Sequence, residues 1–206
     1  MAIYPRNARL QASGQVQTDG AGIREEDTAL VHIALTALEA VVASTTGVRT
    51  AVTDNGSPQV ITTSINNPVY PRNITATAAG TGADIKAVQV IVAGTNMNGD
   101  AITETLPVFT VDTPGTVTGA KIFKTVTSIT IPAHDGTGAT TAIGFGSKLG
   151  IPYKLDNNTV FLAFLNGAKE GTLPTVTTSA TVLESNGMTL SGTLAGTPVD
   201  VYLIVG

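Results

Sequence analysis

One segment near the start of the chain has the hydrophobic pattern of an α-helix. This segment is 24–43, with the sequence REEDTALVHIALTALEAVVA. Between residues 29 and 43 the only polar side chains are His32, Thr36 and Glu39, and their spacing puts them in one narrow stripe of a helix. Acidic residues fill the first turn, where the helix dipole favours negative charge, and Gly47 offers a stop. The pattern therefore predicts a helix over 24–43.

Most of the circumference of this helix is apolar. Leaving a leucine uncovered costs roughly 1.5–3 kcal/mol, and one face of a sheet covers only one side of a helix. We therefore expect the helix to form an oligomer interface, most simply in a homotrimer. The alternative is a helix buried in the core of its own domain. The expected interface residues are Leu30, Ile33, Leu35, Leu38 and Val42.

From about residue 48 onward the pattern changes to alternation with a period of two, rich in Thr and Val, which indicates β-strands. Asn-Gly pairs at 55–56, 98–99, 166–167 and 186–187 supply the positive φ values of tight hairpins. Many short strands joined by turns predict an antiparallel β-sandwich or barrel-like domain. The expected strands are 48–53, 59–65, 73–78, 85–93, 101–110, 121–131, 139–145, 159–166, 174–183, 187–194 and 198–205.

The beginning of the chain has no sustained periodicity. Residues 1–22 contain Pro5 and three glycines and predict an extended arm. The chain thus divides into an arm and attachment helix over 1–46 and a β-sandwich-like domain over 47–206. One interpretation of the arginines in this arm is that they are solvated charges on a chain terminus. The other interpretation is an arm that attaches to a neighbouring subunit through Tyr4, Arg6 and Arg9.

Composition narrows the classes of function. Charged residues are 13% of the 206 residues, roughly half the share of a typical soluble domain, which suits a protein packed against neighbours. A net charge of −4 argues against a nucleic-acid-binding surface. No stretch has the length and apolarity of a membrane span, and the absence of cysteine excludes disulfides and thiolate chemistry. The first residues lack the features of a signal peptide, so we expect assembly in the cytoplasm.

No pattern of residues identifies a catalytic centre. His134 precedes Asp135 in a turn, but adjacent residues seldom orient each other for general-base catalysis, so a polar hairpin tip is favoured. Asn96, Asn98 and Asp100 alternate oxygen side chains as a calcium loop does, yet an Asn-Gly hairpin explains them without a metal. We therefore expect no enzymatic activity, no metal and no cofactor.

Aromatic residues are few, at 4% of the chain. Phe161 and Phe164 lie three apart in an expected strand, which puts them on opposite faces and predicts core positions. The sequence shows no row of exposed aromatic side chains of the kind on which carbohydrates stack.

The β region carries a series of motifs at 71–77 (PRNITAT), 83–95 (ADIKAVQVIVAGT), 102–106 (ITETL), 121–129 (KIFKTVTSI), 148–152 (KLGIP) and 183–190 (LESNGMTL). Together they span about 70–206 and resemble tailed-bacteriophage virion structural proteins of the capsid decoration, or cement, type. The resemblance is one of fold and transfers no functional residues. It implies a small structural protein, whose arm and first helix vary with the attachment site.

Two functions follow as hypotheses. The first is a non-enzymatic decoration protein on the outer capsid surface of a phage virion, bound to the major capsid protein of the same phage and forming a homotrimer, with no nucleic-acid or membrane partner. Many weakly bound copies acting together suit such a shell. The alternative is a receptor- or glycan-binding module of a tail or head fibre.

Overall fold

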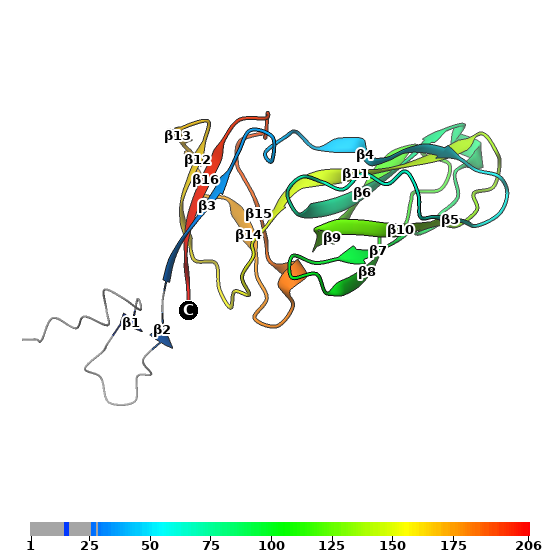
Figure 1. Ribbon diagram of the computed structural model, residues 1–206. Coiled ribbons are helices and arrows are strands. Elements are labelled where there is room, and N and C mark those ends of the chain that lie inside the picture. Colours follow the sequence, from blue (N-terminus) through cyan, green and yellow to red (C-terminus); the bar gives the residue numbers. More distant parts are fainter. Residues whose placement is uncertain (1–14, 17–25, 28) are drawn as a thin grey trace, which may run out of the picture.

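The computed structural model describes residues 15–16, 26–27 and 29–206, and the regular secondary structure of this part of the chain is almost entirely antiparallel strand (Figure 1). The prediction of a mainly β fold is confirmed. No helix in the described residues is long and apolar enough to cross a membrane. The elements are β1 (Gln15–Val16), β2 (Glu26–Asp27), β3 (Ala29–Leu35), β4 (Ser44–Thr53), β5 (Gln59–Ile61), β6 (Arg72–Gly80), η1 (Gly82–Asp84), β7 (Ile91–Thr95), β8 (Ala101–Thr105), β9 (Gly115–Phe123), β10 (Thr125–Ile131), β11 (Ala139–Gly150), β12 (Val160–Leu165), β13 (Ala168–Lys169), β14 (Thr175–Thr177), η2 (Leu183–Ser185), β15 (Gly187–Thr189) and β16 (Val199–Val205).

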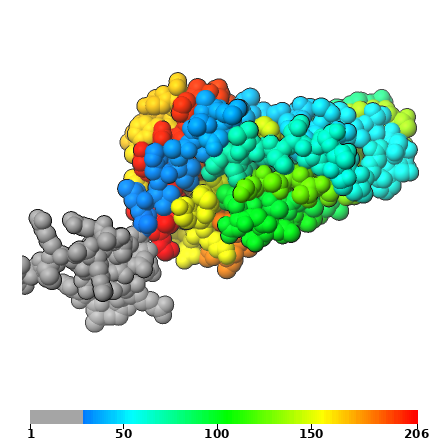
Figure 2. Space-filling view, viewed as in Figure 1, coloured from blue at the N-terminus to red at the C-terminus, as the bar shows by residue number. Residues whose placement is uncertain are grey.

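Three sheets form the body of the molecule. Sheet I has the order β5-β10-β7-β8, sheet II has the order β14-β15-β11-β6-β9 with β4 also paired to β11, and sheet III has the order β13-β12-β16-β3. Figure 1 shows sheet III at one end, with sheets I and II extending away from it, and Figure 2 shows the strands of sheet III gathered on the same end. The expected boundary between 46 and 47 falls within β4.

Two apolar cores lie between these sheets. The first fills the space between sheets I and II and contains Ile74, Phe123 and Ile143. The second contains side chains of sheet III together with Leu149 and Met188 from sheet II. Because β11 supplies residues to both cores, one continuous strand joins the two parts of the molecule.

The prediction of a helix over 24–43 is wrong for those residues of this segment that the structure describes. Residues 29–35 form β3, which pairs in register with β16 from Leu35↔Val199 to Ala29↔Val205. Its sequence, ALVHIAL, alternates so that Val31, Ile33 and Leu35 lie on one side of a strand, and β-branched residues favour the strand. Pairing with β16, the last strand of the chain, selects a strand rather than a helix for this segment.

A single helical turn is what remains of the expected helix. The amide of Ala40 donates to the carbonyl oxygen of Thr36 at 3.0 Å. The Thr36 amide and hydroxyl both donate to Oε2 of Glu39, at 2.9 and 2.8 Å, as at a helix start. These two hydrogen bonds lower the pKa of the Glu39 carboxyl. The helix-start signal in the sequence is therefore genuine, but it starts only one turn.

Arg72 is buried where the two cores meet. Its guanidinium donates from Nη1 to the Gly146 carbonyl at 3.3 Å and from Nη2 to the Glu39 carbonyl at 2.9 Å, and it lies 5.2 Å from the centre of the Phe145 ring. Only 1% of Arg72 is exposed, and burial lowers its pKa to about 10, so it stays charged at neutral pH. None of the ion pairs among the described residues involves Arg72. Carbonyl dipoles and an aromatic face therefore solvate this charge.

Three of the four Asn-Gly pairs form the expected turns, because Gly56, Gly99 and Gly167 all have positive φ values. The turn at Gly99 joins β7 to β8, which confirms the hairpin expected there. Asn186, in contrast, is fully buried at the end of η2, and Gly187 begins a strand.

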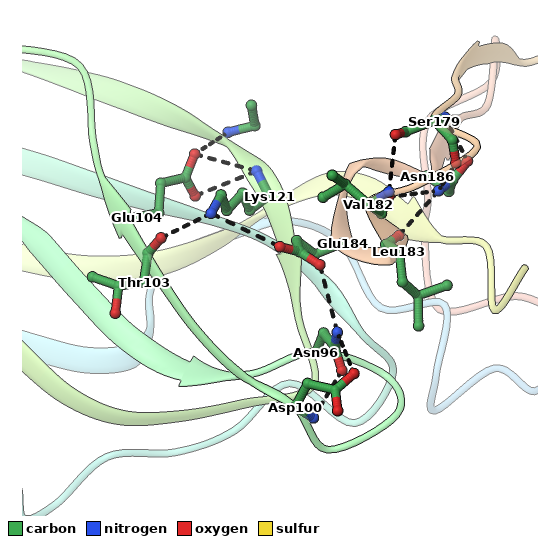
Figure 3. Close-up of polar contacts among 11 residues, drawn as sticks. Asn96, Asp100, Thr103, Glu104, Lys121, Ser179, Val182, Leu183, Glu184 and Asn186 are labelled. Atoms are coloured by element: carbon green, nitrogen blue, oxygen red, sulfur yellow. Dashed lines mark hydrogen bonds and ion pairs between the residues drawn. The ribbon is translucent and has the colours of Figure 1, made fainter. Parts of the chain in front are cut away.

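Asn186 fastens the loop before β15 instead of turning a hairpin (Figure 3). Its Oδ1 accepts from the amides of Leu155 and Ser179 at 3.1 and 2.8 Å. Its Nδ2 donates to the carbonyl oxygens of Ser179 and Val182 at 2.9 and 2.8 Å. The side chain thus satisfies backbone groups that would otherwise be buried without partners.

His134 lies in the expected loop between two strands, but it is buried rather than at an exposed hairpin tip. Only 6% of it is exposed, its backbone amide donates to Asp54 at 2.9 Å, and Nε2 contacts the Thr141 hydroxyl at 3.0 Å. The Lys86 amide donates to Nδ1 at 3.2 Å, which requires an unprotonated Nδ1. Burial lowers the pKa of His134, although Asp54 and Asp135 partly oppose the shift.

We predict that Arg72→Ala lowers the free energy of unfolding by about 3–5 kcal/mol, because it opens a cavity and leaves two carbonyl groups without donors. Urea unfolding followed by circular dichroism measures the change. Arg49→Ala is the matched control, since Arg49 makes one long hydrogen bond to Ser64 at 3.4 Å, and should change stability by less than about 1 kcal/mol. Equal effects of the two substitutions would contradict the role given to Arg72.

We predict that the protein loses stability as the pH falls below 6.5. The unfolded histidine binds a proton near that pH, whereas folded His134 binds one only at lower pH, so acid favours unfolding. Melting temperatures between pH 8 and 5 test this. The decrease should be smaller in His134→Gln than in the wild-type protein. An equal decrease in the two proteins would contradict this role of His134.

Candidate interaction surface

The outward face of sheet III carries an apolar and aromatic surface, which we call the aromatic face. Three cross-strand pairs form most of it, because Leu30, His32 and Ala34 of β3 lie opposite Ile204, Tyr202 and Asp200 of β16. Neighbouring β12 adds Leu162 and Phe164, which lie opposite Tyr202 and Asp200. The intervening residues of β16, Val201 and Leu203, point into the second core.

Aromatic contacts fix the centre of this face. The rings of His32 and Tyr202 are stacked, with centroids 4.4 Å apart and planes 2° from parallel. Phe164 meets Tyr202 edge to face at 6.4 Å. Nε2 of His32 lies 2.7 Å from Oδ1 of Asp200, an ion pair whenever the imidazole is protonated. These contacts hold the side chains in fixed positions on an exposed sheet face.

The sequence-based placement of the two phenylalanines of β12 is wrong. A register irregularity between Val160 and Leu162 turns Phe161 out, and 48% of it is exposed. Phe164 is half-buried on the aromatic face rather than in the core. The sequence did not predict that Phe164 and Tyr202, both half-buried, would lie together on the outward face of sheet III.

The structure divides the expected interface residues into two groups. Ile33 and Leu35 are buried in the second core, with 7% and 4% exposed, so they cannot contact another subunit. Leu30, Leu38 and Val42 are exposed at 68%, 67% and 56%. Three of the five residues thus lie on the surface of one end of the molecule. Tyr4, Arg6 and Arg9 lie outside the described residues.

β3 forms one edge of sheet III. Among the described strands only β16 pairs with it. β3 therefore begins, at Ala29, on the edge of the sheet that carries the aromatic face (Figure 1).

A cluster of charged and amide side chains lies where η2 meets the sandwich (Figure 3). Lys121 Nζ lies 3.8 Å from Oε1 of Glu184 and donates to the Thr103 carbonyl at 3.0 Å. The Asn96 amide donates to Asp100 at 3.2 Å and to Glu184 at 3.5 Å. The carboxylates of Asp100 and Glu184 each already have a donor within the cluster. These contacts therefore hold the η2 loop against sheets I and II.

Sequence reasoning missed the aromatic face because its parts are far apart along the chain. His32 and Tyr202 are separated by 170 residues and meet only through the β3–β16 register. The available signal was the alternation in ALVHIAL, which the helical pattern of the same segment obscured. No group of three or more His, Asp and Glu side chains that could hold a metal occurs among the described residues.

Comparison of the chain with protein-family models, with curated proteins and with solved structures finds no match.

We predict that Leu35→Asp unfolds the protein, because it buries an unpaired carboxylate in the second core, at a cost of about 4 kcal/mol or more. Leu38→Asp should leave the melting temperature within about 2 °C of wild type, since Leu38 is exposed. Light scattering then tests the expected homotrimer, which Leu38→Asp should dissociate. A folded Leu35→Asp protein would contradict the assignment of Leu35 to the core.

Proposed function

We propose that this protein is a non-enzymatic structural component of a bacteriophage virion that decorates the outer capsid surface. In this proposal the aromatic face and the adjacent N-terminal segment attach to the major capsid protein. The remaining end of the molecule, with sheets I and II, projects outward. The protein is made and assembled in the host cytoplasm.

The observation that carries the proposal is the aromatic face. Apolar side chains gathered on an exposed surface are a feature of sites of protein association. Leu30, Ile204 and Phe161 are exposed at this end of the molecule at 68%, 44% and 48%. The low charge of the whole chain, at 13%, also suits a protein that packs against neighbours. The motifs between 71 and 190 that resemble phage decoration proteins support the same proposal.

Homotrimer formation remains part of this proposal. Leu38 and Val42 lie in the connection between β3 and β4, next to sheet III, and both are exposed. They offer a self-association surface distinct from the aromatic face. A trimer would present three aromatic faces to the shell, which raises the affinity through multivalency.

The stacked rings favour a protein partner over a sugar for this face. His32 covers one side of the Tyr202 ring at 4.4 Å, so that side is closed to a pyranose ring. The alternative function, a receptor- or glycan-binding module of a fibre, therefore requires a different surface.

We predict that the protein binds heads of its own phage that were assembled without it, and that Leu30→Asp abolishes binding. The new carboxylate would be desolvated in the interface, which costs several kcal/mol. Co-sedimentation of purified protein with such heads measures binding, and electron microscopy locates the bound copies.

Val60→Asp is the matched control, because Val60 is 67% exposed and lies on β5 of sheet I, away from the aromatic face. It should bind heads as wild type does. Failure of the wild-type protein to bind heads would refute the decoration role, and loss of binding in Val60→Asp alone would place the attachment site on sheet I.

A further inference from the structure

Two bulges face each other across β6 on the outer side of sheet II. In β11, residues 146–148 lie between the partners of Ile74 and Arg72, which are Phe145 and Leu149. In β9, residues 119–121 lie between the partners of Thr75 and Asn73. Bulges bend a strand away from its ladder and are frequent beside functional sites. Here they lie opposite two adjacent residues of β6: the bulge in β11 is opposite Asn73, and the bulge in β9 is opposite Ile74.

Asn73 fixes both bulges. Its Nδ2 donates to the Gly119 carbonyl at 3.1 Å, and its Oδ1 accepts from the Lys148 amide at 3.1 Å. Only 2% of Asn73 is exposed. The bulge in β11 also requires glycine at position 146, since a Cβ there would lie 2.5 Å from the Asn73 side chain, which two hydrogen bonds hold in place. The arrangement is thus specified by several side chains together.

The result is a groove of about 510 Å³ on the outer face of sheet II. Hydroxyl side chains from several strands line it, among them Ser44, Thr116, Thr118, Ser147 and Thr189. Phe145 adds a partly exposed aromatic ring. The volume is within the range of pockets that bind small molecules.

The floor of the groove contains an unpartnered polar group. Thr75 lines the groove and is 6% exposed, and its Oγ1 has no hydrogen-bond partner. A buried hydroxyl without a partner is costly, so a polar ligand that reaches the floor would gain an interaction there.

The chemistry of the lining identifies the class of ligand. Hydroxyl and amide groups both donate and accept, which complements the hydroxyls of a sugar. Lys148 is the one charged residue of the lining, and no carboxylate lines the groove. We propose that this groove binds a short saccharide and prefers one with an acidic unit. This site is separate from the aromatic face and does not rest on the decoration role.

The test uses two matched probes, digalacturonate and its neutral counterpart galactobiose, added to the isotope-labelled full chain. Digalacturonate should shift the backbone amide signals of 116–120 and 146–148, with an affinity about fivefold higher than that of galactobiose. Lys148→Met retains the side-chain stem and should remove this preference. Thr118→Trp should block the groove and abolish binding of both probes.

Thr50→Trp is the control, because Thr50 is exposed on β4 of the same sheet and does not line the groove. It should bind both sugars as wild type does. The proposal is overturned if neither sugar shifts the groove amides, if Thr118→Trp binds normally, or if galactobiose binds as well as digalacturonate. Leu30→Asp should retain sugar binding and Thr118→Trp should retain binding to heads, which separates this site from the decoration role.

Discussion

Arg72 carries a charge at the boundary of two apolar cores, and the arrangement of the sheets depends on how that charge is satisfied. Burying a guanidinium without hydrogen-bond partners would cost far more free energy than its packing contributes. Carbonyl groups from two distant segments accept from it, one at Glu39 and one at Gly146, and Phe145 lies beneath it. Arginine suits this position better than lysine because its planar fork reaches both acceptors and is weakly hydrated. The turn after β3 and the bulge in β11 are therefore tied to the same residue.

Much of the β architecture can be predicted from the sequence, because its signals are local. Alternating Thr and Val residues and the Asn-Gly pairs at 55–56, 98–99 and 166–167 mark strands and turns without reference to distant residues. Strand β3 could not be predicted in this way. ALVHIAL fits both periods, and the Thr36–Glu39 pair adds a genuine helix-start signal. Only pairing with β16, at the other end of the chain, selects the strand.

Functional surfaces were predicted less well than the fold, for the same physical reason. Exposure of Leu30 and burial of Leu35 follow from the strand register, and a helical projection put both on one interface. Asn186 and His134 show a related limit. Each lies in a sequence typical of an exposed turn, yet each is buried because its side chain satisfies backbone groups from other segments. Local sequence indicates that a polar residue lies in a loop, but contacts with other segments of the chain decide whether that residue is exposed.

The groove and the junction of the two cores share residues, so their geometry is linked. Gly146 gives its carbonyl oxygen to Arg72, while its Cα faces the Asn73 side chain that also fixes the bulge in β9. Arg72 and Asn73 are adjacent in β6 and point to opposite faces of sheet II, one toward the junction and the other toward the groove. A change that shifts β11 to accommodate a new residue at the junction also moves one wall of the groove. The aromatic face lies on a separate sheet and shares none of these hydrogen bonds, so a substitution there should leave the groove unaltered.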